Sequence, residues 1–316
     1  MLRLLLLAAV VLVHPATPAQ AQRTVAVTLD DLPVVSGTEL AEAERVTDAL
    51  LDALAAHGAV ADVFVTGANV EVDGEAEARR GLLRRWRDAG HVLHNHGHSH
   101  LRYSETDPAV YLADTERGQR LVEGYFEGDG PSGEGAFFRA PYNDLGASAE
   151  SRAALAAALD RDGVRLAPFT VEHADWLFNA VYRDALARGD TAIARRTGRA
   201  YLAQLDAAFA FAEGLSAETF GREVPQVFLL HANRINADHL GAMIQRLAER
   251  GYTFVTLAEA VRDPAYATAD AYTRKWGVSW LHRWRVGLGV PSALRDEPEP
   301  PGWVTEAYEA LAERGL

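Results

Sequence analysis

Two adjacent carboxylates, Asp30 and Asp31, follow the apolar run of residues 25–29. Like charges side by side repel each other, and the apolar run indicates a partly buried strand, so the pair needs a compensating charge. A metal ion or an arginine would provide it. Candidate partners are the histidine-rich segment of residues 91–100 and Arg139, which follows another apolar run. Alternatively, both carboxylates are solvated in a turn where the strand ends.

The histidine-rich segment offers metal ligands. His96 and His100 are four residues apart, which places both rings on one side of a helical turn or tight loop. His94 and His98 have the same spacing, so spacing alone leaves two registers open. Two imidazoles and one carboxylate leave coordination positions free, and an open Zn²⁺ site lowers the pKa of bound water toward about 7. Because the chain has no Cys, any metal site must use His and carboxylates.

Charge and composition argue against several functions. The chain has 31 basic and 44 acidic residues, and its formal net charge is −13. This negative charge argues against nucleic acid as a partner. Lys275 is the only lysine, and no Gly-rich loop ends in Gly-Lys-Ser/Thr. We therefore expect neither a lysine Schiff base nor a nucleotide-binding P-loop.

Residues 1–21 have the three parts of a secretory signal peptide. Arg3 supplies a positive charge, residues 4–13 form a short apolar core, and Ala19-Gln20-Ala21 is a small-x-small cleavage site. The apolar core is too short to span a bilayer. We therefore expect cleavage near Ala21 and an exported protein, periplasmic or secreted, with no stable membrane span.

From about residue 23 to residue 262, short apolar runs alternate with longer segments of helical period, the pattern of βα units. Predicted strands are residues 24–29, 61–66, 92–95, 136–140, 164–171, 226–230 and 253–256. Predicted helices are residues 38–57, 75–89, 109–126, 147–161, 237–250 and a long Ala-rich pair over about 179–214. We predict an α/β fold, a distorted (β/α)7-type barrel, in residues 22–263, with a helical insertion in residues 178–225.

Residues 264–316 have a different pattern. This segment holds four of the six Trp residues, with Trp276, Trp280 and Trp284 at helical spacing. A Pro-rich stretch at 297–301 precedes an amphipathic helix predicted over 303–314. We predict a helical C-terminal extension whose aromatic side chains pack on the barrel. The alternative is an aromatic platform for sugar rings or for protein docking.

Five polar clusters follow the first, third, fourth, fifth and sixth predicted strands, and reactive residues of parallel α/β folds gather at such strand ends. These clusters resemble the five motifs of the NodB-type polysaccharide deacetylases, carbohydrate esterase family 4. In chain order they are Thr28-Leu29-Asp30-Asp31, Asn95-His96 with His100, Arg139-Ala140-Pro141-Tyr142, Asp175-Trp176 and Leu229-Leu230-His231. The resemblance covers about residues 24–261, and residues 250–257 are similar to the closing strand of the family.

The resemblance implies roles for the first three motifs. Asp30 would be the general base, and Asp31 would be a metal ligand. The two imidazoles of the second motif would complete the ligand set, and Asn95 indicates the register by preceding the first of them. These ligands are His96 and His100. The third motif would pair Arg139 with the base and supply the backbone amide of Tyr142 to the oxyanion.

The last two motifs imply an acid and an acetyl pocket. Asp175 would orient the acid, Trp176 would wall the pocket, and Leu229 would line it. His231 would be the general acid. The implied cofactor is a divalent metal, Zn²⁺ first, with Co²⁺ or Ni²⁺ as alternatives. The implied partner is an acetylated glycan.

Three positions depart from the family pattern. Leu32 stands where Gly usually follows the two Asp, Gly97 stands where Ser or Thr usually follows the first ligand, and His94 replaces a common Gly. None of them removes a ligand, base or acid. The leading hypothesis is a metal-dependent hydrolase that removes N- or O-linked acetyl groups from a glycan. The alternatives are a hydrolase of another non-peptide amide, such as a cyclic imide or ureide, and a low-activity glycan-binding envelope protein.

Overall fold

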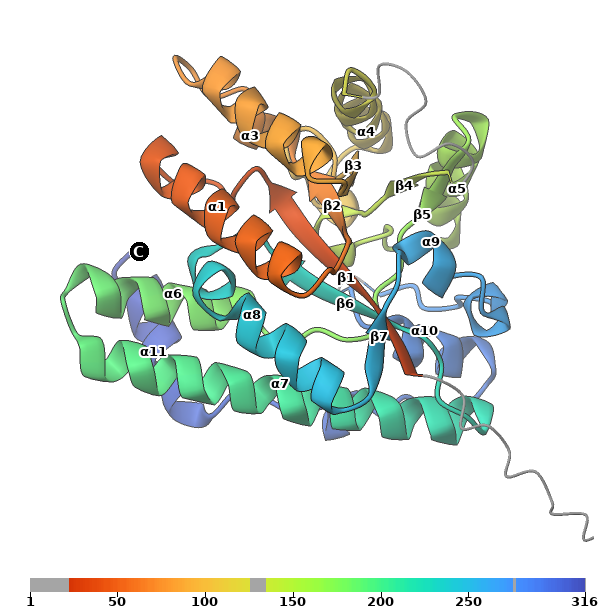
Figure 1. The fold of residues 1–316 in the computed structure, drawn as a ribbon. Coiled ribbons are helices and arrows are strands. Elements are labelled where there is room, and N and C mark those ends of the chain that lie inside the picture. The colour runs from red at the N-terminus through yellow and green to blue at the C-terminus, as the bar shows by residue number, and fades with distance from the viewer. Residues whose placement is uncertain (1–22, 126–134, 275–276, 316) are drawn as a thin grey trace, which may run out of the picture.

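A computed structural model describes residues 23–125, 135–274 and 277–315, so the predicted signal peptide lies outside the described residues. Seven parallel strands form one curled sheet surrounded by helices (Figure 1). The strands are β1 Arg23–Leu32, β2 Ala61–Val65, β3 Val92–Asn95, β4 Ala136–Phe138, β5 Val164–Leu166, β6 Gln226–His231 and β7 Tyr252–Phe254. Their order is β5-β4-β3-β2-β1-β6, and β7 pairs with the start of β1. The predicted α/β fold, a distorted (β/α)7-type barrel, is confirmed.

The segment after β5, residues 167–171, closes the curled sheet, and we call it the crossing segment. Ala167 N–H donates to the carbonyl of Phe138 on β4 at 2.8 Å. Three residues later, Thr170 N–H donates to the carbonyl of Val227 on β6 at 2.9 Å. The crossing segment therefore connects the two edges of the sheet and completes the barrel wall.

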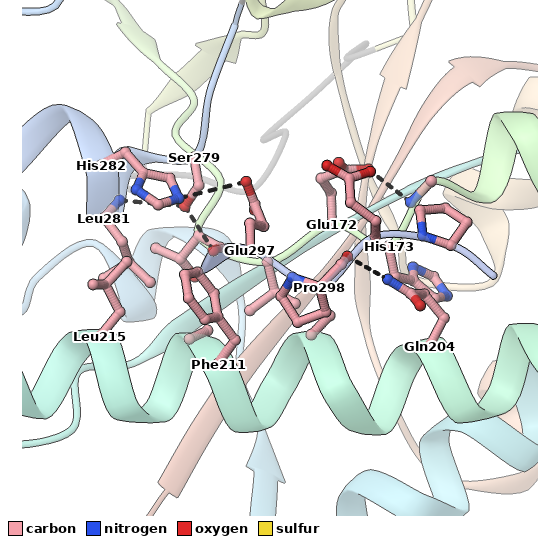
Figure 2. A pocket seen from close by; sticks show the side chains of 17 residues that line it. Glu172, His173, Gln204, Phe211, Leu215, Ser279, Leu281, His282, Glu297 and Pro298 are labelled. Atoms are coloured by element: carbon pink, nitrogen blue, oxygen red, sulfur yellow. Dashed lines mark hydrogen bonds and ion pairs between the residues drawn. The ribbon is translucent and has the colours of Figure 1, made fainter. Parts of the chain in front are cut away.

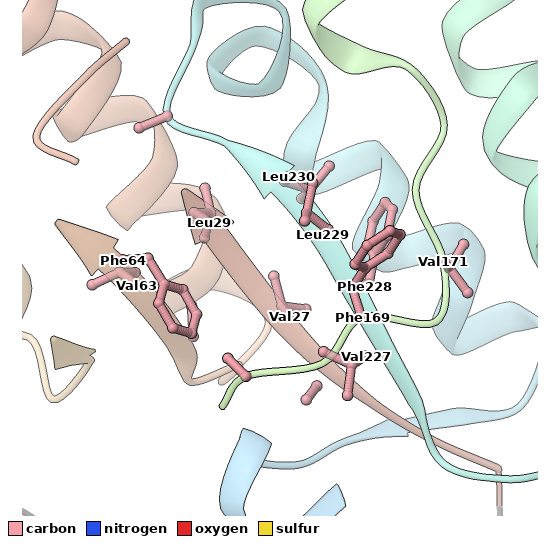
Figure 3. Close-up of a cluster of buried hydrophobic side chains, with 14 of the residues drawn as sticks. Val27, Leu29, Val63, Phe64, Phe169, Val171, Val227, Phe228, Leu229 and Leu230 are labelled. Atoms are coloured by element: carbon pink, nitrogen blue, oxygen red, sulfur yellow. The ribbon is translucent and has the colours of Figure 1, made fainter. Parts of the chain in front are cut away.

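The barrel core is apolar because its strands are buried on both faces, as is usual for parallel sheets. Val27 and Leu29 of β1 lie near Phe64 of β2 and Phe228 of β6, and all are at most 1% exposed (Figure 3). Burying one such side chain fully stabilises a fold by about 1.5–3 kcal/mol. The strand ends that carry the polar motifs are therefore held by a well-packed core.

Helices cover the outside of the barrel, and several begin at residues whose side chains cap the first turn. Asp107 caps the helix that starts with Pro108, and Asn233 caps the helix that follows β6. The covering helices are α1 Leu40–Ala56, α2 Gly67–Val70, α3 Ala76–Asp88, α4 Pro108–Glu123, α5 Ala149–Arg161, α8 Arg234–Glu249 and α9 Leu257–Ala260. Because the strands are parallel, each of these helices helps to return the chain to the end of the barrel where the next strand begins.

The predicted long helical pair is present as α6 Asp175–Ala187 and α7 Thr191–Phe220. With 30 residues, α7 is about 45 Å long, and it runs beneath the sheet in Figure 1. The N-cap Asp190 starts α7, and Gly221, in the left-handed conformation, ends it. The first turn of α6 already contains the motif residue Asp175, so this helix begins at the rim of the barrel.

The C-terminal residues add α10 Trp280–Gly287 and α11 Gly302–Glu313. Trp280, Trp284, Val304 and Leu311 belong to the same buried apolar cluster as the barrel strands. Helix α10 packs against α7 and α11 packs against α6. Trp276 lies outside the described residues, and the domain boundary near residue 263 stays a prediction. In the described part of the chain, no helix is long and apolar enough for a membrane span.

Candidate active site

A β-bulge separates the two adjacent carboxylates. The register between β1 and β2 shifts between Leu29 and Leu32, and Asp31 has a φ of 67°. A bulge re-aims side chains, so Asp30 stays 2% exposed while Asp31 turns toward the histidine segment. Leu32 returns to the ladder opposite Val65 and is fully buried. The departure from the family Gly at this position therefore fills the core and does not occupy the rim.

The structure brings Asp31, His96 and His100 together. Their ligand atoms all lie within 4.8 Å of one another. Asp31 Oδ1 is 3.4 Å from His100 Nε2 and 3.8 Å from His96 Nε2. Two ligands of a tetrahedral Zn²⁺, each at 2.0–2.1 Å from the ion, are about 3.4 Å apart. Two imidazoles and one carboxylate at these separations fit a divalent metal with open positions.

Neighbouring groups orient the three candidate ligands. His96 Nδ1–H donates to the carbonyl of Arg139 at 2.7 Å, which leaves the Nε2 lone pair facing Asp31. Thr66 Oγ1 donates to Asp31 Oδ1 at 3.0 Å. Burial lowers the pKa of His100 to about 4, so at neutral pH its ring is uncharged and free to coordinate. Burial alone would raise the pKa of Asp31, but the nearby imidazoles, His100 first, lower it overall.

The other two histidines of the segment point elsewhere. His94 Nε2–H donates to Asp62 Oδ1 at 2.9 Å, and its Nδ1 accepts from the N–H of Phe137 inside the barrel. His98 Nε2 lies 2.9 Å from a carboxylate oxygen of Glu71. The structure therefore groups His96 and His100 with Asp31 and keeps the alternative register apart.

Side chains brace the loop that carries the two imidazoles. Asn95 Oδ1 accepts from Gly97 N–H at 2.8 Å, and the Asp114 carboxylate accepts from the N–H groups of His98 and Ser99. Gly97 has a φ of 75°, and a Cβ there would lie 3.3 Å from Asp114 Oδ2. Glycine therefore suits this position for backbone reasons, and Asn95 and Asp114 brace the loop where position 97 has no hydroxyl.

Asp30 is held by a fully buried arginine. Arg139 Nη1 donates to Asp30 Oδ1 at 2.9 Å and to Thr28 Oγ1 at 2.7 Å. Its Nη2 donates to the carbonyl of Pro168 in the crossing segment at 2.9 Å. Such charge-assisted bonds offset the cost of burying a carboxylate. Asp30 Oδ2 faces the three candidate ligands and lies 3.8 Å from His96 Nε2.

His231, whose side chain is 20% exposed, pairs with the buried Asp175. Its Nδ1–H donates to Asp175 Oδ1 at 2.7 Å, while Asp175 Oδ2 accepts from the His231 N–H and from the side chains of Asn233 and Asn236. Burial alone would lower the pKa of His231, but Asp175, followed by Asp31 and Asp30, raises it to about 10. Burial likewise opposes ionisation of Asp175, and His231 lowers its pKa. At neutral pH this is an imidazolium–carboxylate pair.

The three residues predicted to bind substrate differ in exposure. The Tyr142 ring is 46% exposed and lies 4.6 Å from the ring of His100, with the Arg102 guanidinium 3.8 Å from its centroid. Trp176 is 49% exposed. Leu229 is 4% exposed and pairs with Thr28 across β6 and β1. Two aromatic side chains at the rim are therefore available to a ligand.

Sequence reasoning gave no role to four supporting residues. Thr28 and Thr66 hold Arg139 and Asp31, as described above, and Asn233 and Asn236 hold Asp175. One signal was available, because Thr66 directly follows β2, and the two Asn lie at the N-cap and first turn of the helix after His231.

The polysaccharide deacetylase family model matches residues 17–158 of this chain. One similar solved structure is the wild-type CE4 family pseudoenzyme from Bacillus anthracis, 16% identical over 76% of this chain and 66% of that chain, with a TM-score of 0.51. A mutant of that pseudoenzyme is 16% identical over 78% and 71% of the two chains, with a TM-score of 0.53. The peptidoglycan deacetylase PdaC from Bacillus subtilis is 22% identical over 78% and 95%, with a TM-score of 0.49.

A search of curated proteins gave no match. At these identities the solved structures with TM-scores above 0.5 establish a shared fold. The family match, over residues 17–158, agrees with this shared fold and with the motifs of the chain. The predicted resemblance to the NodB-type deacetylases is therefore confirmed.

Proposed function

We propose that this protein is an exported, metal-dependent hydrolase that removes N- or O-linked acetyl groups from a glycan. One observation carries the proposal: three candidate ligand atoms within 4.8 Å lie next to an arginine-held carboxylate, Asp30, and a carboxylate-held imidazole, His231. A base, an acid and a ligand set are the groups that hydrolysis of an amide or ester by water requires.

Asp31, His96 and His100 would hold the metal, Zn²⁺ first, with Co²⁺ or Ni²⁺ as alternatives. Such a cation polarises the acetyl carbonyl and makes water more acidic. Asp30 would accept the proton of the attacking water, because Arg139 occupies its Oδ1 and leaves Oδ2 on the metal side. Arg139 fixes the direction in which this carboxylate points.

The tetrahedral oxyanion needs donors that are already in place. The backbone N–H of Tyr142 would supply one, since it lies in a left-handed turn beside His100. His231 would give its Nε2 proton to the leaving amine or alcohol, because Asp175 occupies Nδ1 and keeps the ring charged. A protonated leaving group departs as a neutral molecule, which completes hydrolysis.

The rim suits a sugar-bearing substrate. Exposed rings such as Tyr142 and Trp176 present apolar faces that sugar rings cover well. The predicted signal peptide would deliver the enzyme to the periplasm or the medium, where envelope and extracellular glycans are found. The net charge of −13 disfavours polyanions as substrates.

The decisive experiment measures acetate release by the mature protein, from residue 22, loaded in turn with Zn²⁺, Co²⁺ and Ni²⁺. Substrates are chitooligosaccharides, peptidoglycan fragments and acetylated xylan, with a cyclic imide and a ureide in parallel. Asp30→Asn is the matched control, since it should keep the metal and lose at least 1000-fold in kcat. Turnover of the imide or ureide alone would indicate the other amide hydrolase. Glycan binding with no release from any substrate would indicate the binding protein.

A further inference from the structure

We infer that Arg283, from the C-terminal residues, is a positioning residue for the turn Tyr142–Asn143, which carries the backbone amide assigned to the oxyanion. The use of that amide rests on the proposed function. The support that Arg283 gives the turn is a property of the fold, and this support can be measured without an activity assay.

The turn needs support because its backbone is strained. Tyr142 and Asn143 have φ values of 57° and 51°, and this left-handed conformation costs about 1–2 kcal/mol for a residue such as Tyr, whereas Asn adopts it more readily. The following amides are satisfied locally, since Asn143 N–H and Asp144 N–H donate to carbonyls of the same turn. The Tyr142 N–H has no acceptor within the described residues. A free amide held in a costly conformation is a common feature of binding and catalytic turns.

Arg283 lies in α10 and is 1% exposed. Its Nη2 donates to the carbonyl of Asn143 at 2.8 Å, its Nε donates to the carbonyl of Val278 at 3.0 Å, and its Nη1 lies 3.1 Å from Asp270 Oδ2. Asp270 is also bound by Arg152 of α5. The guanidinium is thus fixed by two other partners and presents a rigid donor to the turn.

The C-terminal chain also crosses directly over the turn. A Cβ at Gly277 would lie 2.3 Å from the carbonyl oxygen of Tyr142 and 2.3 Å from the Cβ of Asn143. Real Cβ atoms are not found at such distances, so the approach requires glycine. The turn is therefore enclosed by residues that lie more than 130 positions further along the sequence.

The same chain segment is anchored to the barrel wall. Ser279 Oγ donates to the carbonyl of Thr170 at 2.7 Å, and Trp280 N–H donates to the carbonyl of Phe169 at 2.9 Å. Both acceptors belong to the crossing segment, next to Pro168, whose carbonyl accepts from Arg139. The C-terminal residues therefore contact both the turn Tyr142–Asn143 and the crossing segment, which holds Arg139, the partner of the proposed base.

Further along, the chain passes a cavity of about 80 Å³ between the crossing segment and α7 (Figure 2). His282 Nε2 lies 3.5 Å from Glu297 Oε2, and Gln204 Nε2 of α7 donates to the carbonyl of Pro298 at 2.6 Å. These contacts fix the part of the C-terminal chain that follows α10. Arg283 is thus held at both ends of its segment.

The experiment compares Arg283→Met with Arg285→Met. Arg285 lies on the same helix, but its partners are the carbonyl of Pro291, Thr219 Oγ1 and the carboxylate of Glu218, so it serves as the matched control. In Arg283→Met we expect kcat for acetate release to fall 10- to 1000-fold, with KM and bound metal unchanged, in line with loss of one oxyanion donor. Hydrogen exchange at the amides of Asn143 and Asp144 should become faster. Neither change is expected in Arg285→Met.

A rescue variant separates support of the turn from general stability. Glycine adopts the left-handed conformation without strain, so adding Asn143→Gly to Arg283→Met should recover part of the lost kcat. The inference would be overturned if Arg283→Met had the same kcat as the wild type, or if hydrogen exchange at the amides of residues 143–144 was unchanged. The inference would also be overturned if the amides of the strands lost as much protection from hydrogen exchange as residues 143–144 and the metal was lost as well. If the wild-type protein released no acetate, the proposed function would fail, and the exchange data alone would still decide the role of Arg283.

Discussion

Asp30 and His231 are register partners across the parallel strands β1 and β6. The N–H of Ala232 donates to the carbonyl of Asp30 at 2.9 Å, which extends the ladder to the end of both strands. The spacing of the proposed base and acid is therefore fixed by backbone hydrogen bonds between two buried strands. Sites built on such strands hold their geometry more accurately than sites built on loops.

Substitution of His96 should affect metal binding, whereas substitution of His94 should affect stability. His96→Ala removes a candidate ligand, so we expect loss of bound metal and at least a 100-fold loss of kcat. His94→Ala should retain the metal but lower the free energy of unfolding by about 2–4 kcal/mol, because Asp62 Oδ1 and the Phe137 N–H lose their buried partner. Metal analysis by mass spectrometry and urea unfolding measure both. Metal loss in His94→Ala with retention in His96→Ala would show that the register is wrong.

Asp175→Asn should shift the alkaline limb of the pH–rate profile. In the wild type, Asp175 is the first charge that raises the pKa of His231, to about 10, so the imidazolium is present below that pH and lost above it. Without this carboxylate, the pKa of His231 should fall toward its ordinary value near 6.5, and the limb should move to lower pH. An unchanged alkaline limb would rule out His231 as the acid.

The same pair also links stability to pH. Because folding raises the pKa of His231, its contribution is complete below about 6.5 and is lost as pH rises through about 10. Thermal unfolding measured between pH 6 and pH 10 should show this loss in the wild type and a smaller one in Asp175→Asn.

Arg139→Met should reduce both stability and turnover. The arginine is fully buried and bonds Asp30, Thr28 and Pro168, so its loss leaves a buried carboxylate unpaired. Breaking a buried ion pair from one side costs about 3–5 kcal/mol. Urea unfolding should show this loss, and kcat should fall at least 100-fold. A variant of Arg161, whose ion pair with Asp162 lies at the surface, is the control and should change unfolding by less than about 1 kcal/mol.

Removal of the metal should lower the melting temperature. A ligand that binds only the folded state stabilises it, by about 2.7 kcal/mol at 100 times its Kd. We expect a chelator to lower the Tm and abolish acetate release, and added Zn²⁺ to restore both. In Asp31→Ala the chelator should have no further effect on Tm. A chelator-induced shift of equal size in Asp31→Ala would place the metal elsewhere.

Gly97→Ser tests a departure from the family pattern. The new side chain would have to adopt a φ of 75° and would place its Cβ 3.3 Å from Asp114 Oδ2. We therefore expect about 1–2 kcal/mol of destabilisation and no gain in activity, although Ser is the usual family residue. Increased stability on urea unfolding would show that the loop lacks a bracing hydroxyl.

The strands and the positions of the motifs were predictable because apolar runs identify buried strands and polar residues follow them. The sequence also placed Asp30, Arg139 and His231 at one rim, since parallel strands share their carboxyl edge. The β-bulge that separates Asp30 from Asp31 was not predictable, because no local pattern marks the register shift. A strand prediction ending at residue 29 therefore left both carboxylates in a loop.

Contacts between distant parts of the chain were also beyond sequence reasoning. Trp176 of α6 meets Tyr308 of α11 with ring centroids 5.2 Å apart, and Arg283 reaches Asn143 across 140 positions. Such pairs depend on how helices pack, which periodicity does not encode. His94 illustrates the same limit, since a histidine inside the barrel becomes intelligible once Asp62 is seen beside it.

Gly118 of α4 is a position where the helix backbone directly touches the loop of the two imidazoles. A Cβ there would lie 2.4 Å from Asn95 Oδ1 and 2.8 Å from the carbonyl carbon of Gly97, whereas a Cβ at Gly124, the C-cap residue of α4, would meet nothing closer than 3.4 Å. Substitutions that change ligand contacts therefore have room at the exposed rings of the rim. They have none at this contact, where one added methyl group would push the imidazole loop away from its helix.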